Sequence, residues 1–150
     1  MVELLVTLTL LALLASVAVP LGQLTAQRNR EMELRIDLRD LRRAIDAYKR
    51  AYDEGQIEKK VGESGYPPTL ETLVQGVDDS KSLESRKKIY FLRRIPRDPM
   101  CNCPDTPPQE TWNLRSYASP PDAPRAGKDV FDVASRSKEE ALDGTHYNTW

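Results

Sequence analysis

The most reactive side chains in this chain of 150 residues belong to two cysteines and one histidine. Cys101 and Cys103 are separated by one residue, in a loop bounded by prolines. Three states fit this spacing: a disulfide within the loop, which an oxidising compartment favours, free or intermolecular thiols, or contact with a metal or cofactor. A covalent haem site needs Cys-x-x-Cys-His and a structural zinc site needs four ligands, so these residues alone form neither.

Nothing else in the sequence predicts catalysis. No serine or cysteine nucleophile lies at a diagnostic spacing from His146, and the chain has no glycine-rich phosphate loop, zinc-hydrolase helix or nucleophile elbow. With 22 basic and 23 acidic side chains, it also lacks the basic excess on which phosphate binding depends. We therefore expect a protein that is not an enzyme, has no resident cofactor and does not use nucleic acid as its main partner.

Glu3 is the most unusual charged residue, because it directly precedes a long uncharged segment. The run from Leu4 to Gln27 would be about 36 Å long as a helix, enough to cross a hydrocarbon core of about 30 Å. A carboxylate at such a place is costly in a membrane and needs a partner. A secretory signal peptide would begin with basic residues, yet the first one here is Arg28. A conventional membrane anchor explains the length of the run but not Glu3 or Pro20.

The next segment has the periodicity of an amphipathic helix, with no helix breaker before Gly55. Its apolar residues recur at alternating steps of four and three and form one stripe that can pack on a core: Leu34, Leu38, Leu41, Ile45, Tyr48 and Tyr52. Opposite charges four residues apart predict ion pairs on its solvated faces: Glu31 with Arg35, Arg42 with Asp46, Asp46 with Arg50, and Lys49 with Asp53. If Pro20 and Gly22 only kink the path, one helix of about 50 residues results; local melting is the alternative.

The remaining elements are predicted to be short. Thr69 is a suitable N-cap for a helix carrying Leu70, Leu73 and Val74. Residues 80–92 are predicted to form a further helix, and alternation of apolar and polar residues predicts strands over 112–117 and 129–134. We expect these strands in an antiparallel sheet of two or three strands laid against the long helix. The core tyrosines are expected to be Tyr48, Tyr52, Tyr90 and Tyr117.

The predicted fold class is therefore α+β, with a long N-terminal transmembrane and amphipathic helix packed on a small antiparallel sheet. It comprises a transmembrane stem helix over 1–24, an amphipathic helix over 25–55, and a globular region over 56–150 with short helices, strands and a C-terminal loop.

The chain resembles the type IV pilin-like proteins, and within them the major pseudopilins of type II secretion systems. The segment VELLVTLTLLALLASVAVP is similar to the hydrophobic stem that follows the prepilin peptidase cleavage site, with Glu3 at the position of the stem glutamate and Pro20 at that of the kinking proline. KDVFDVASRSKEEALDGTHYNTW resembles the closing strand and loop of the pseudopilin globular domain, and GYPPTLETLV and FLRRIPRDPM resemble segments after the long helix.

The resemblance implies a pilin-like fold and a structural subunit of a helical pseudopilus for protein secretion across the outer membrane. It implies cleavage by prepilin peptidase and methylation upstream of Met1, and a single-pass protein of the bacterial inner membrane with a periplasmic C-terminal domain. The implied partners are further copies of the chain, the inner-membrane secretion platform and minor pseudopilins. Self-assembly is expected to use a group of residues in the stem: Glu3, Leu4, Leu5, Leu8, Pro20 and Gly22.

The resemblance also implies a calcium site in the last loop, with Asp143 at a ligand position. Asp132, Glu139, Glu140 and main-chain oxygens could supply the other ligands. Calcium takes six to eight oxygens, and Arg136 and Lys138 would compete for the carboxylates. The alternative is a loop held by hydrogen bonds and by packing of Trp150.

Two alternative functions stay open. One is a type IV pilin of a surface filament, for adhesion, motility or electron transfer. The other is a membrane-tethered periplasmic binding or redox domain that uses the loop of Cys101 and Cys103.

Overall fold

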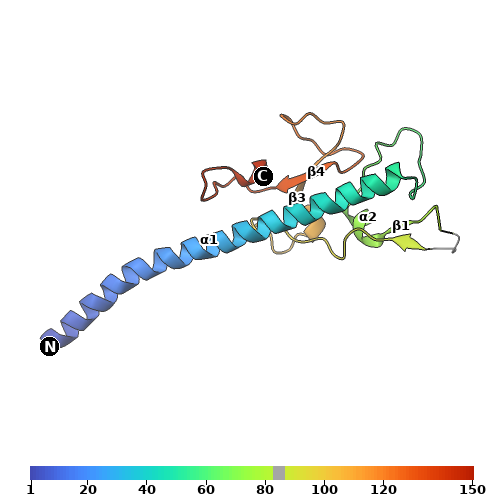
Figure 1. The fold of residues 1–150 in the computed structure, drawn as a ribbon. Coiled ribbons are helices and arrows are strands. Elements are labelled where there is room, and N and C mark those ends of the chain that lie inside the picture. Colours follow the sequence, from blue (N-terminus) through green and yellow to red (C-terminus); the bar gives the residue numbers. More distant parts are fainter. Residues whose placement is uncertain (83–86) are drawn as a thin grey trace.

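The computed structural model describes residues 1–82 and 87–150. Its dominant element is α1, a single helix of 52 residues (Val2–Asp53). The other elements are α2 (Leu70–Gln75), β1 (Val77–Asp78), β2 (Lys88–Ile89), β3 (Trp112–Arg115), β4 (Asp132–Ser135), and the 3-10 turns η1 (Pro108–Glu110) and η2 (Tyr147–Thr149). Figure 1 shows α1 as a gently curved rod whose N-terminal half projects away from all other elements.

In the structure α1 continues through positions 20 and 22 as one helix. It stops where glycine permits a sharp change of direction. Gly55 has a φ of 75°, a left-handed conformation that other residues adopt at a cost, and its N–H donates to the carbonyl of Tyr52 at 3.0 Å. The residues after this turn fold back along the second half of the helix.

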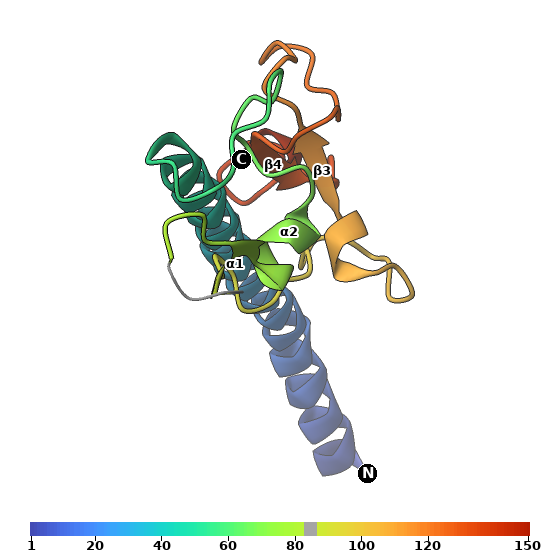
Figure 2. The same cartoon turned by 90° about the vertical axis from the view of Figure 1, so that its right-hand side faces the viewer.

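The core lies on one side of the second half of α1. All six residues of the apolar stripe from Leu34 to Tyr52 are buried, with at most 9% of their surface exposed. They pack in one cluster with apolar residues from α2, from the β3–β4 region and from the C-terminal segment: Leu70, Leu73, Trp112, Val130, Val133, Ala141 and Tyr147. Figure 2 shows these elements gathered around one end of α1. Burial of each large side chain stabilises the fold by roughly 1.5–3 kcal/mol.

Within residues 1–82 and 87–150 the strands form two separate two-stranded ribbons. β1 pairs antiparallel with β2, and β3 pairs antiparallel with β4 in a register that sets Trp112 opposite Ser135. Two-stranded ribbons are marginal by themselves, so packing on a helix is needed for their stability. β4 contacts α1 directly. The chain thus combines a long apolar N-terminal helix with small two-stranded antiparallel sheets, an α+β arrangement.

A helix was expected over residues 80–92. The described parts of this segment, residues 80–82 and 87–92, are not helical. Lys88 and Ile89 are a strand, and the N–H groups of Phe91 and Leu92 both donate to the carbonyl of Leu73. Gly76, with a φ of 74°, ends α2 and turns the chain into β1, which then provides a strand partner for this segment. Leu83, which was expected on that helix, lies outside the described residues.

The expected strands differ from the observed ones at their ends. β3 stops at Arg115, because the Ser116 hydroxyl and the N–H of Tyr117 both donate to the carboxylate of Asp129. The assignment of all four tyrosines to the core was also wrong. Tyr90 and Tyr117 are 64% and 61% exposed, although Tyr117 still stacks on Tyr66 with ring centroids 5.5 Å apart.

Candidate functional site

The first candidate site is the projecting stem of α1. α1 is long and apolar enough to cross a membrane, and none of its most apolar window is buried against the rest of the chain. Leu4, Leu5 and Leu8 are 66%, 66% and 59% exposed. An apolar surface of this size on a water-soluble protein marks contact with lipid or with another protein. The globular region therefore leaves the stem free for such a contact.

The hydroxyl groups of the stem are satisfied within the helix. Each of its three hydroxyl groups donates to a backbone carbonyl three or four residues earlier: Thr7 to Leu4, Thr9 to Leu5, and Ser16 to Leu13. Thr25, just after the stem, donates to Leu21 in the same way. Such internal bonds lower the cost of placing hydroxyls in an apolar medium. Gly22 is not required for space, because a Cβ there would meet nothing within 4 Å.

Glu3 differs from these residues. It lies in the first turn of α1, where the positive end of the helix dipole favours an acid. Within the described part of the chain it makes no hydrogen bond or ion pair. One copy of the chain thus exposes an unpaired carboxylate at the end of an apolar helix.

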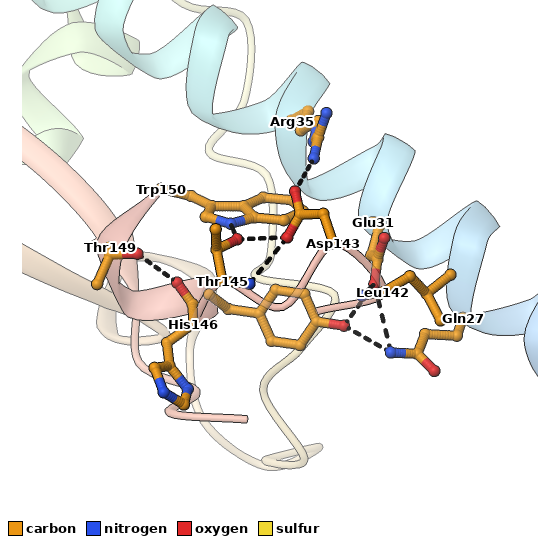
Figure 3. A network of polar contacts seen from close by, with 10 residues as sticks. Gln27, Glu31, Arg35, Leu142, Asp143, Thr145, His146, Thr149 and Trp150 are labelled. Carbon is orange, nitrogen blue, oxygen red and sulfur yellow. Dashed lines mark hydrogen bonds and ion pairs between the residues drawn. The ribbon is translucent and has the colours of Figure 1, made fainter. Parts of the chain in front are cut away.

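The second candidate site is the junction between the stem and the globular region, which Figure 3 shows from close by. Glu31, only 8% exposed, accepts hydrogen bonds through Oε1 from the Tyr147 hydroxyl at 2.8 Å and from the N–H of Leu142 at 2.9 Å. Gln27 donates to the same Glu31 oxygen at 3.3 Å and to the Tyr147 hydroxyl at 3.0 Å. Burial raises the pKa of the Tyr147 hydroxyl above its ordinary value. We call Gln27, Glu31, Leu142 and Tyr147 the junction network.

A second group of contacts holds the C-terminal loop one helical turn further along α1. Arg35 pairs with Asp143 at 3.0 Å and lies over the Trp150 ring, 4.2 Å from its centroid. The hydroxyl and N–H of Thr145 both donate to Asp143, and with Arg35 they hold the pKa of this carboxyl below its usual value. Trp150 donates through Nε1 to the Thr145 hydroxyl at 2.6 Å. The last loop is thereby fixed to the helix.

Arg42 makes a third link to the same side of the molecule. Its Nε donates to Asp132 at 2.8 Å, and its terminal nitrogen donates to the carbonyls of Val133 and Trp150 at 3.0 and 2.7 Å. A planar guanidinium serves all three acceptors at once, which an ammonium group would not do with the same geometry.

These contacts correct the expected ion pairs along α1. Among the four predicted pairs, only Lys49 with Asp53 is present in the described residues, at 2.5 Å. Glu31, Arg35 and Arg42 instead bind residues around 90 or more positions later in the chain. Glu31 was assigned to a solvated face and is in fact buried.

The cysteine loop is closed by a disulfide between Cys101 and Cys103, whose Cα atoms are 5.2 Å apart. Arg97 donates to three carbonyls of this loop, those of Cys103, Pro104 and Thr106. Asp98, 1% exposed, accepts from the Ser135 hydroxyl at 2.7 Å and so links the start of the loop to β4. The loop is thus fixed at its base independently of the disulfide.

The two aspartates expected as calcium ligands are both bound to arginines. Asp132 pairs with Arg42, and Asp143 pairs with Arg35. In residues 1–82 and 87–150 no group of three or more His, Cys, Asp and Glu side chains is placed to hold a metal. Calcium at this loop stays a prediction. The arrangement that the structure does show is the alternative one, a loop held by hydrogen bonds and by Trp150.

Searches of protein-family profiles, of curated proteins and of solved structures found no match to this chain.

Proposed function

We propose that this protein is a structural subunit that assembles with copies of itself into a helical filament through its N-terminal stem. The observation that supports this is the contrast along α1. One face of its second half is buried and held by three sets of polar contacts, whereas its first half is apolar and exposed and begins with an unpaired Glu3. A membrane accommodates such a stem in the single subunit, and neighbouring stems cover it in an assembly.

The apolar stem supplies affinity outside the bilayer. Each large apolar side chain that neighbouring stems remove from water contributes roughly 1.5–3 kcal/mol. Within the bilayer this driving force is absent, and the carboxylate of Glu3 then sets the arrangement. An ionised acid in an apolar bundle is stable only when paired, so a step along the filament that leaves it unpaired is disfavoured. The partner that the pilin resemblance implies is the amino terminus of the adjoining subunit.

The finer proposal follows the resemblance of the stem to major pseudopilins. The filament is then a pseudopilus that serves type II protein secretion from the inner membrane across the outer membrane, with the globular region in the periplasm. A surface pilin would use the same stem for long extracellular fibres. Deletion of the gene separates the two, because loss of secreted proteins favours the pseudopilus and loss of surface fibres with normal secretion favours the pilin.

The test of filament assembly uses Glu3→Leu in the full-length protein. We expect filaments to be lost while circular dichroism shows a folded globular region. Glu58→Leu is the matched control, because Glu58 is also exposed but lies in the globular region, and this variant should assemble normally. Normal filaments from Glu3→Leu would contradict the proposal.

A further inference from the structure

The C-terminal loop meets α1 where the uncharged run of the helix ends. The run from Leu4 to Gln27 is about 36 Å long as a helix, about 6 Å more than the hydrocarbon core of a bilayer. Its last residues, about four of them, therefore extend into the interfacial layer, which is about 5–7 Å thick on each side. Gln27, at the end of the run, donates to Glu31 and to Tyr147. The junction network thus lies at the level of the membrane surface when the stem spans a bilayer.

Leu142 is the exposed apolar residue of the loop at this level. Its N–H donates at 2.9 Å to Oε1 of Glu31, the same oxygen to which Gln27 donates. Side chains of a helix lean toward its N-terminus, so this oxygen lies nearer to the stem than the backbone of Glu31 does. The Leu142 side chain is 42% exposed, and Figure 3 shows it on the side of the loop nearest to Gln27. It therefore presents apolar surface on the stem side of the loop.

The stem presents apolar surface on the same side of α1. Leu24 lies seven residues before Glu31, which is almost two full turns, so both side chains leave the helix in nearly the same direction. Leu24 is 44% exposed. Leu24 from the helix and Leu142 from the loop thus border the same space next to α1.

The loop holds Leu142 in an ordered turn. The N–H of Ala141 donates to the carbonyl of Thr145 at 2.7 Å, and the N–H of Gly144 donates to the carbonyl of Ala141 at 3.0 Å. Asp143 is bound to Arg35 on α1. Because the loop is already ordered, it loses little conformational freedom when it meets a partner, which favours binding through the exposed leucine.

The charged side chains around Leu142 are of both signs. Arg28 and Arg30 follow the uncharged run on α1, Glu139 and Glu140 come shortly before Leu142 in the loop, and all four are exposed. None of the four makes an ion pair within residues 1–82 and 87–150. A zwitterionic phospholipid headgroup carries a phosphate, which pairs well with arginine, and an ammonium group, which attracts carboxylates. The mixed charges therefore suit such a headgroup layer.

We propose that the C-terminal loop lies on the surface of the membrane that α1 crosses, with Leu142 at the boundary between headgroups and acyl chains. This inference rests on the membrane-spanning stem of the proposed function and adds a second membrane contact, made by the globular region. Because Leu142 lies on only one side of α1, the contact also sets the direction in which the helix tilts.

The test attaches a nitroxide spin label to Leu142→Cys in the full-length chain, in vesicles of palmitoyl-oleoylphosphatidylcholine at a low ratio of protein to lipid. The native cysteines stay in their disulfide and do not take the label. Power saturation compares the collisions of the label with oxygen, which concentrates in acyl chains, and with a nickel chelate, which stays in water. We expect an oxygen-to-nickel collision ratio close to that of a label at Leu24→Cys.

His146→Cys is the matched control, because His146 is also exposed in the same loop but lies on the side away from Gln27. The collision ratio of its label should be several-fold lower. Equal ratios for the labels at Leu142 and His146 would overturn the proposal. A ratio at Leu142 that falls when the protein is diluted further in lipid would also overturn it, because the label would then contact another copy.

The wild-type chain gives a second measurement without any substitution. The same vesicles are prepared with a phosphatidylcholine that carries a diazirine on the first carbons of one acyl chain, so that light attaches this lipid to residues in contact with it. Mass spectrometry should find the lipid on the peptide that contains Leu142 as well as on the stem. Adducts on the stem alone would overturn the loop contact.

Neither measurement needs filaments, so the outcome is separate from that of the Glu3 test. Lipid contact at Leu142 without wild-type filaments would support the membrane contact and remove the filament proposal. Filaments from a chain whose Leu142 label collides mostly with the nickel chelate would remove the loop contact and keep the filament. A water-exposed label at Leu24 would contradict the spanning stem, and the loop contact with it.

Discussion

The Tyr147 hydroxyl donates a 2.8 Å hydrogen bond to the carboxylate of Glu31, across 116 positions of sequence. This bond joins the C-terminal segment to α1 close to the point where the exposed stem begins. Together with Gln27, it marks where contact between α1 and the C-terminal segment begins, and so which length of α1 is left without such contact.

The junction network should contribute measurably to stability. Tyr147→Phe keeps the ring but removes two hydrogen bonds, the one donated to Glu31 and the one accepted from Gln27. We expect the free energy of unfolding to fall by about 1–2 kcal/mol. Glu31→Ala leaves both the Tyr147 hydroxyl and the N–H of Leu142 without an acceptor, so a loss of roughly 2–3 kcal/mol is expected. Urea unfolding of the full-length protein in detergent micelles measures both. Glu33→Ala is the matched control, with an expected change within about 0.5 kcal/mol; equal losses for Glu31 and Glu33 would contradict this role.

We expect Arg42 to stabilise the attachment of the C-terminal loop to α1 more than its neighbour Arg43 does. Arg42→Ala removes the bonds to Asp132 and to two carbonyls, and we expect a loss of about 1–2 kcal/mol, because the pair is partly exposed to solvent. Arg43→Ala should have little effect in the single copy. Hydrogen exchange reports the difference directly, since only Arg42→Ala should increase exchange in residues 141–150. Unchanged protection there in Arg42→Ala would refute the assignment.

Asp37 should make the protein less stable as the pH rises. Its pKa is raised from 3.8 to about 6 in the folded chain, so the folded state holds a proton that the unfolded state has already released. The resulting stabilisation is complete below pH 3.8 and is lost as the pH rises to about 6. After allowance for solvent screening, we expect a fall of about 1 kcal/mol across this window.

Asp37→Asn supplies the comparison for this pH effect. The asparagine variant should lack the contribution of Asp37 to the slope between these pH values. It should be more stable than wild type at neutral pH. Urea unfolding at a series of pH values measures both proteins, and parallel pH profiles would show that Asp37 titrates at its ordinary pKa.

The disulfide should be dispensable for assembly. Replacement of Cys101 and Cys103 by serine opens a very small ring, and the expected loss of stability is about 1.5 kcal/mol. Arg97 and Asp98 still fix the base of the loop. Filaments counted by electron microscopy should therefore persist. Complete loss of function with normal folding and assembly would instead favour the membrane-tethered redox domain.

Local patterns were sufficient to predict the long helix and the face of it that packs on the core. The steps of four and three from Leu34 to Tyr52 identify this face, because residues at this spacing lie on one side of a helix and all six are buried in the core. The spacing of four residues gave the wrong ion-pair partners for Glu31, Arg35 and Arg42, because it considers only partners within the same helix. Their real partners, Tyr147, Asp143 and Asp132, are brought near by the tertiary fold, which no short-range spacing encodes.

The prediction of a helix around Lys88 and Ile89 was wrong for a related reason. Its composition allows a helix, but the turn at Gly76 places β1 beside it, and pairing with Val77 and Asp78 is a tertiary choice. Isolated strands of two residues have no periodicity that a sequence could display. Glu3 is a different case: its position in the sequence was visible, while the partner that we propose for it belongs to another copy of the chain.

Electron cryomicroscopy of the native assembled protein tests the central claim most directly. The account predicts filaments in which the stems from Val2 onward bundle in the interior, with each Glu3 carboxylate within about 4 Å of an amino group of an adjoining copy. Particles in which the stems do not touch one another, or filaments in which Glu3 faces solvent without a partner, would contradict it.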